Sequence, residues 1–341
     1  MNRKTMLWGV AGGVALILAQ LAVRHFLAPL SPSLESDSLL PPSAYVSTPQ
    51  RDRLLSRYIG DVLAFSTLHE TGHMLISVNH IPKPEDEEDE VDRFAVMVLS
   101  KNRAHMHHDA LLSAAEFWSA LHRLRGGRPY DPRAKHSEPQ VRADAIVCLM
   151  YGEDPKRYAD MAEDMKMPEG RRSECRDRAR RNSSRWGGVL ASNLNAELYY
   201  NLGIQKPGIA VIYDPVPDGL PESSTAELTH ARTLVADARV LDIVAGQLVQ
   251  LRLPYKMVGR MQITTSSLHP GVNHPETGAD LGEYDYVVQA DACLDKEGNP
   301  EVNAFWDPGN HTMTLCYALV NEIENTGKSV IAEAVAKNFV H

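Results

Sequence analysis

Two histidines and a glutamate, His69, Glu70 and His73, form an HExxH sequence. On a helix, positions four apart share one face, so both imidazoles can reach a single metal ion. Glu70 directly follows the first histidine and can act as a general base toward a metal-bound water. Apolar residues surround the motif, as a buried helix needs: Phe65, Leu68, Met74 and Leu75. We therefore expect a zinc site on a helix; the simpler alternative is two ordinary helical histidines.

A third ligand is required, because catalytic zinc takes three protein ligands and leaves one position for water. The acidic run 85–90 follows the motif and suits the positive end of a helix dipole. In such a helix Glu88 and Asp92 share a face. We expect Glu88 to be the third ligand and Asp92 to hydrogen-bond the free ring nitrogen of a ligand histidine. Other candidates for the third ligand are Glu85, Glu87, Asp89, Glu90 and His80, and the simplest reading of the run is a solvated loop.

Peptide hydrolysis also needs a positive or proton-donating group near the oxygens of the tetrahedral intermediate. His136 and Arg142 are the candidates, although surface charge at the start of a helix explains them equally well. Further histidines gather between residues 102 and 125 without acidic or cysteine partners at ligand spacing, so we interpret them as exposed or packing residues: His105, His107, His108 and His122.

The N-terminus has the composition of a targeting segment. Arg3 and Lys4 precede an uncharged apolar stretch, Met6 to Val23, which is at the short end of what spans a bilayer. Because no small-x-small cleavage site follows it, we expect residues 1–30 to be a signal-anchor, with a cleaved signal peptide as the alternative. Residues 31–52, rich in Ser and Pro, would be a linker. The rest of the chain would then be periplasmic or in the cell envelope.

Four cysteines fit an exported protein with two disulfides. They allow three pairings, between which the sequence does not decide, but their clustering suggests Cys148–Cys175 and Cys293–Cys316. The net charge of -9 argues against a nucleic-acid partner, which would need a basic face. The basic run 171–185 contains acids, so a solvated helix face is expected there.

The 341 residues are enough for one large domain or two modest ones. Residues 53–190 are expected to form a helical core, including helices at 51–78 (one, or two in line) and 110–124. Residues 191–341 are expected to be an α/β segment. It would contain short strands at 208–213 and 261–265, a helical run at 226–251, and a loop at 268–282 that could line a cleft.

Several of these segments together resemble a known family. They are the HETGH core, the run from Glu87 to Ala95, and then Arg142, the segment Cys148 to Gly152, Arg171, Cys175 and Trp186, in that order. This order resembles bacterial proteins classed as zinc metallopeptidases, a family first catalogued as a domain of unknown function. Glu88 to Asp92 is also similar to the ExxxD helix of membrane-bound gluzincin peptidases. The resemblance implies a zincin-like domain, with Glu88 as zinc ligand and Asp92 supporting a ligand histidine.

One segment departs from the family order. Cys293, the stretch Asn303 to Pro308, and Leu315 to Tyr317 are similar to residues that precede the HExxH helix in the family. Here they lie near the C-terminus, and Ala318 stands where the family has a glutamate. The resemblance thus implies a permuted order, in which residues 191–341 complete the same domain, a mainly helical α+β fold with a small β-sheet.

Together these features predict an extracytoplasmic zinc endopeptidase acting on protein or peptide substrates. The alternative from another class is a catalytically inactive, zinc-stabilised binding or scaffold protein of the cell envelope. A closed four-ligand site would favour that alternative.

Overall fold

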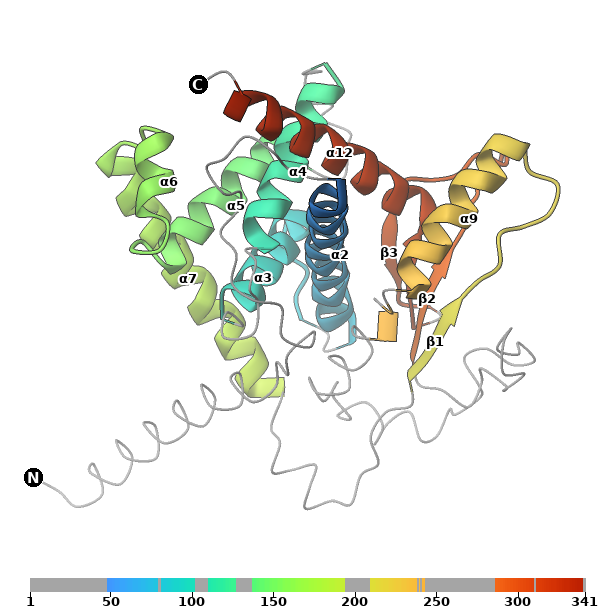
Figure 1. The fold of residues 1–341 in the computed structure, drawn as a ribbon. Helices are drawn as coiled ribbons and strands as arrows, with labels where there is room; N and C mark the ends of the chain where they lie inside the picture. The colour runs from blue at the N-terminus through green and yellow to red at the C-terminus, as the bar shows by residue number, and fades with distance from the viewer. Residues whose placement is uncertain are drawn as a thin grey trace, which may run out of the picture.

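The computed structural model describes residues 48–78, 81–101, 110–126, 137–193, 209–237, 239, 241–242, 286–309 and 311–339. Over these ranges the chain is mainly helical with a small four-stranded sheet, which confirms the expected α+β class. The long helix α2 (Thr48–Val78) runs through the middle, with other helices on one side and the sheet on the other (Figure 1). The HExxH residues lie in the C-terminal half of this one continuous helix.

The helical side contains five further elements: α3 (Glu87–Lys101), α4 (Ala110–Leu124), α5 (Pro139–Glu153), α6 (Ala159–Asp164) and α7 (Glu169–Asn193). Pro82 and Pro84 separate α2 from α3, because proline lacks the N–H that a helix interior needs. Four acidic residues occupy the first turn of α3, where the helix dipole favours negative charge. Pro139 starts α5, a position at which proline is tolerated. Local sequence signals therefore fix where the site-bearing helices begin.

The sheet has the strand order β1-β2-β4-β3. Its strands are β1 (Ile209–Tyr213), β2 (Tyr286–Asp291), β3 (Ala304–Asp307) and β4 (Thr312–Cys316). β1, β2 and β4 are parallel, whereas β3 pairs antiparallel to β4 at one edge. Every residue of β4 is buried, and α9 (Glu222–Asp237) and α12 (Tyr317–Phe339) contact the sheet.

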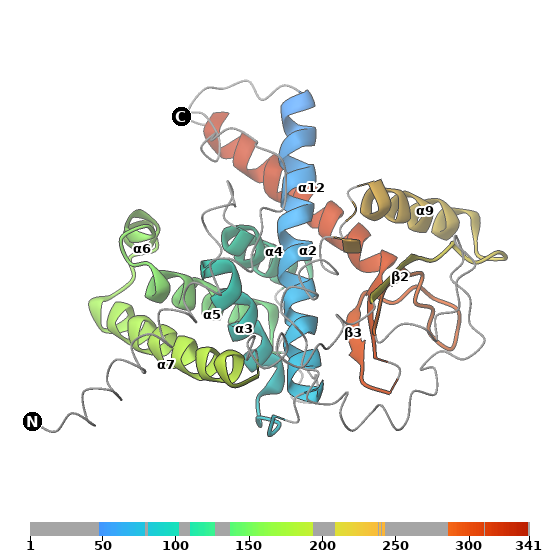
Figure 2. The same cartoon turned by 90° about the horizontal axis from the view of Figure 1, so that it is seen from below.

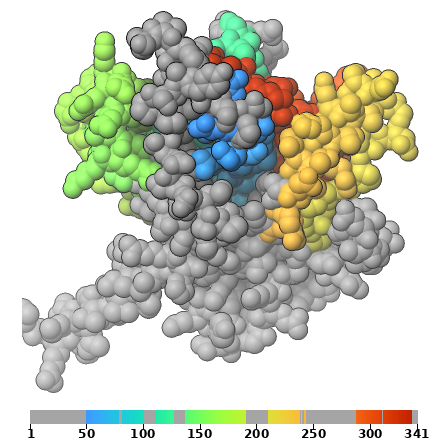
Figure 3. Space-filling model, in the orientation of Figure 1, coloured from blue at the N-terminus to red at the C-terminus, as the bar shows by residue number. Residues whose placement is uncertain are grey.

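The last of these helices, α12, crosses α2 (Figures 1 and 2). At Gly327 the two helices are so close that a Cβ atom would lie 2.6 Å from Cδ1 of Tyr58 and 2.9 Å from Cδ1 of Leu55. One hydrophobic core runs from α2 into the sheet and α12. The C-terminal helix thus packs against the helix that carries the HExxH motif. Figure 3 shows α2 at the surface between the helical side and α9.

The cysteines form the pairs suggested by their clustering. Cys148–Cys175 joins α5 to α7, and Cys293–Cys316 links the turn after β2 to the end of β4. In α7, exposed arginines pair with acids of the same helix, such as Arg178 with Glu174, which fits the expected solvated face.

The helix expected at 226–251 is interrupted. α9 starts at Glu222 and ends at Asp237, and Arg239 has a φ of 50°, which an α-helix cannot continue through. Residues 241–242 are helical again, and residues 243–251 lie outside the described residues. The strand expected at 261–265 and the loop at 268–282 lie outside the described residues, as do the N-terminal segment and most of the linker. Among the helices that are described, none combines the length and apolar character needed to cross a membrane.

Candidate metal centre

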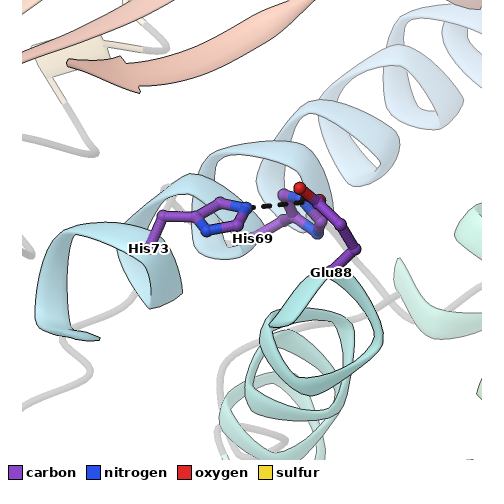
Figure 4. Close-up of side chains that lie close together, drawn as sticks. All are labelled: His69, His73 and Glu88. Carbon is purple, nitrogen blue, oxygen red and sulfur yellow. Dashed lines mark hydrogen bonds and ion pairs between the residues drawn. The ribbon is translucent and has the colours of Figure 1, made fainter. Parts of the chain in front are cut away.

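Two helices bring His69, His73 and Glu88 together. One possible ligand atom from each residue lies within 4.8 Å of the other two. The Nε2 atoms of both histidines are 3.3 Å from the same oxygen, Oε2 of Glu88. Figure 4 shows the two rings on α2 and the carboxylate on α3 directed toward one another. Of the predicted ligands, these three therefore meet in space.

The close approach of α2 and α3 depends on Gly72, which lies between the two histidines. A Cβ atom at this position would be 2.7 Å from Cβ of Val91, far inside van der Waals contact. Val91 is fully buried and lies between Glu88 and Asp92. Because glycine has no side chain, the backbone of α3 can approach near enough for Glu88 to reach both imidazoles.

The Nδ1 atom of His69, on the side of the ring away from Glu88, faces a buried ion pair. This nitrogen is 2.7 Å from Oδ1 of Asp92. Arg142 on α5 donates hydrogen bonds to both oxygens of Asp92, at 2.6 and 2.7 Å. The guanidinium also lies 3.7 Å from the ring centre of Trp118. Asp92 and Arg142 are each only 6% exposed, so this support belongs to the protein core.

The Nδ1 atom of His73, also on the side of the ring away from Glu88, faces a different carboxylate. This nitrogen is 2.7 Å from Oε1 of Glu87, and Oε2 of Glu87 is 2.6 Å from Nζ of Lys83. The Lys83 side chain is 78% exposed. Each histidine thus has its own carboxylate on the nitrogen away from Glu88, which fixes the ring orientation and directs Nε2 toward the site.

These contacts shift several pKa values. Burial alone would lower the pKa of His69, but the hydrogen bonds with Asp92 and Glu88 outweigh it and raise that pKa to about 9. The pKa of His73 is also raised, because Glu88 and Glu87 outweigh its burial. Burial opposes ionisation of Asp92, yet the charge of Arg142 and the contact with His69 hold its pKa well below the usual range. The raised pKa values of both histidines mean that the surrounding carboxylates favour a positive charge at this position.

The donor set fits a divalent metal ion. Two imidazole nitrogens and one carboxylate are the protein ligands of many catalytic zinc sites, with bonds of about 2.0–2.2 Å. Neighbouring donors on such a tetrahedron are separated by roughly 3.3–3.4 Å. Both nitrogen-to-oxygen distances at Glu88 are 3.3 Å. The residues present are thus consistent in kind and spacing with a shared ion.

Of the remaining candidates, Glu70 lies beside the three ligands: it is buried, and its Oε1 is 3.9 Å from Nε2 of His69. Arg142, considered as a group facing the reaction intermediate, instead binds Asp92 on the Nδ1 side of His69. His122 pairs with Glu138 at 2.6 Å. The other candidate histidines fall outside the described residues: His80, His105, His107, His108 and His136.

The other acids of the run 85–90 face other partners. Asp89 accepts a hydrogen bond from Ser137, and buried Glu90 pairs with Arg93 and Arg185. Glu85 is exposed. Glu87, considered as a ligand, contacts His73 on the nitrogen opposite Glu88. Sequence reasoning missed this contact, although its position one residue before Glu88 is a signal that it starts the same helix.

Residues 43–190 match the model of a family described as "Putative metallopeptidase". This range includes both site helices and the supporting residues on α5. Neither the curated proteins nor the solved structures give a match.

Proposed function

We propose that this chain, whose residues 43–190 belong to that metallopeptidase family, is an extracytoplasmic zinc-dependent endopeptidase. The observation that carries the proposal is the convergence of His69, His73 and Glu88 from two helices, beside the buried carboxylate of Glu70. A purely structural metal site has no use for a carboxylate at Glu70. Its presence favours an enzyme over a zinc-stabilised scaffold.

The chain's own residues would divide the work as follows. An ion held by the three ligands would lower the pKa of a bound water and polarise the peptide carbonyl. Glu70 would accept the proton of that water and return it to the leaving amine. Asp92 and Glu87 would hold the imidazoles with Nε2 inward, and Arg142 would keep Asp92 ionised and oriented. In this proposal Arg142 acts through Asp92, not on the substrate.

The choice of zinc rests on the ligand types, two imidazoles and one carboxylate. The extracytoplasmic location rests on the two disulfides, which persist in oxidising compartments, and on the apolar N-terminal stretch. We further propose that residues 1–30 anchor the chain to a membrane.

The test compares wild type with Glu70→Gln for zinc content and for cleavage of casein or a peptide library. Because Gln cannot accept the proton, we expect zinc to be retained and cleavage to fall by at least about 100-fold. Undiminished cleavage in the variant would remove Glu70 as the base. Wild-type protein that holds zinc but cleaves no substrate would support the scaffold instead.

The third ligand is tested separately. Glu88→Ala should lower zinc occupancy sharply, whereas Glu85→Ala, which removes an exposed acid from the same run, should not. Full zinc content in both variants would show that Glu88 is not a ligand.

A further inference from the structure

Glu87 uses both of its carboxylate oxygens away from the proposed ligand position. Oε1 meets Nδ1 of His73 at 2.7 Å, and Oε2 meets Nζ of Lys83 at 2.6 Å. Glu88, the next residue, lies on the other side of the same ring, at Nε2. Consecutive acids therefore hold one imidazole from opposite edges, and only one of them has an oxygen toward both histidines.

We propose that Glu87 is a positioning residue for the metal centre, which keeps the His73 ring turned with Nε2 toward the ion. This inference rests on the proposed function, because it assumes that His73 is a ligand. A carboxylate on the outer ring nitrogen fixes the tautomer and raises the basicity of the ligating nitrogen. His73 needs such support because its side chain is 17% exposed, against 5% for His69.

Lys83 extends this support to the surface. It lies in the segment between α2 and α3, and the backbone N–H of Ile81 in that segment donates to the carbonyl of Ile76 in α2 at 3.0 Å. Pro82 and Pro84 flank Lys83 and restrict its backbone. The ammonium therefore approaches Glu87 from a stretch tied to the helix that bears His73. It holds the carboxylate in place without entering the core.

The experiment measures the zinc dissociation constant by chelator competition for wild type, Glu87→Ala, Glu87→Gln and Glu85→Gln. Loss of such a support typically weakens metal binding by about 10- to 100-fold, which we expect for Glu87→Ala. Glu87→Gln should lose less, because its amide oxygen still accepts a hydrogen bond from Nδ1–H. Glu85→Gln also removes one negative charge, but from an exposed side chain two residues before Glu87. This variant should therefore bind zinc as wild type does.

Two further measurements separate positioning from a general effect on folding. With cobalt in place of zinc, a turned His73 ring should change the visible absorption spectrum of Glu87→Ala but not of Glu85→Gln. Lys83→Met changes an exposed residue, so folding is preserved, and removing this ion pair should weaken zinc binding by about 1.5- to 5-fold.

The outcomes are distinct. If wild type binds zinc and both Glu87 variants bind it equally well with the wild-type cobalt spectrum, the role of Glu87 is wrong and the proposed function survives. If Glu87→Ala does not fold, Glu87→Gln and Lys83→Met decide in its place, and wild-type affinity in both overturns the inference. If the wild-type chain takes up no zinc, the proposed function itself fails.

Discussion

His69 and His73 are one helical turn apart on α2, yet the supports behind their rings differ in depth. Behind His69 lies Asp92, held by Arg142 in the core, and both side chains are nearly inaccessible to solvent. Behind His73 lies Glu87, held by the exposed Lys83. The same arrangement, a carboxylate on the ring nitrogen away from Glu88, therefore has a buried partner behind His69 and an exposed partner, Lys83, behind His73.

This difference predicts which substitutions should change metal binding without changing the stability of the fold. A buried ion pair that loses one partner leaves an uncompensated charge in the interior, so the fold and the site fail together. A surface ion pair contributes little to stability, so its loss affects mainly what it orients. We expect variants on the His69 side to destabilise the fold and variants on the His73 side to act mainly on metal binding.

The largest effect is expected for Arg142→Ala, since the buried Asp92 would lose the guanidinium that binds both of its oxygens. We expect a loss of about 3–5 kcal/mol in the free energy of unfolding, measured by urea denaturation of the metal-free chain. Arg180→Ala is the matched control, because Arg180 is 78% exposed and pairs with Asp177 in its own helix. Equal stability of the two variants would contradict the comparison.

Gly72→Ala should disrupt the contact between α2 and α3, on which the positions of both histidines and Glu88 depend. The added Cβ would overlap Val91, so α3 must move and carry Glu88 with it. We expect a loss of about 1–3 kcal/mol in stability together with weaker zinc binding. Gly60→Ala lies in the same helix with nothing within 4 Å, and should leave stability unchanged or raise it by up to about 1 kcal/mol. If Gly72→Ala stabilised the protein, α2 and α3 would have space for a methyl group at this position, which would contradict the prediction.

The third prediction concerns pH in the metal-free chain. The pKa of His69 is raised from 6.5 to about 9, so the folded state binds the proton more tightly than the unfolded state does. This contribution to stability is complete below about pH 6.5 and is lost as the pH rises through about 9. Zinc competes with the same proton, so zinc affinity should rise over that window.

Urea denaturation from pH 6 to 10, with chelator present, measures this term as the difference between wild type and His69→Asn. The difference should shrink as the pH rises. A constant difference would mean that His69 has no raised pKa in the folded chain.

The smallest effect on stability is expected for Lys83→Met. Lys83 is largely exposed, so the free energy of unfolding of the metal-free chain should change by less than about 0.5 kcal/mol, measured by urea denaturation. A change as large as that of Arg142→Ala would place both supports in the same class and end the distinction between them.

The central part of the site could be predicted from sequence because helical spacing determines it. His69 and His73 share a face by their separation, and Glu88 and Asp92 do so by theirs, once an acidic run is taken as a helix start. Proline positions gave the break between the two helices. Helical spacing and helix breaks are local properties, so the residues of the segment itself determine them.

The roles of Glu87 and Arg142 could not be predicted in the same way. Successive helical residues differ in direction by about 100°, so the roles of Glu87 and Glu88 depend on the rotation of α3, which Gly72 and Val91 set by packing. Arg142 reaches Asp92 from a helix 50 residues further along, and its choice of partner follows from how α5 packs. Similarly, apolar residues at helical spacing continue past Asp237, but the positive φ of Arg239 ends α9.

The packing of α12 across α2 has a consequence for how the protein is made. The apolar surface of α2 around Leu55 and Tyr58 is covered by a helix that follows it by most of the chain's length. During synthesis α12 cannot cover this surface until Gly327 has left the ribosome. Contacts between such distant residues form slowly and leave apolar surface open to aggregation in the meantime. We therefore expect the nascent chain to need a chaperone until its C-terminal helix arrives.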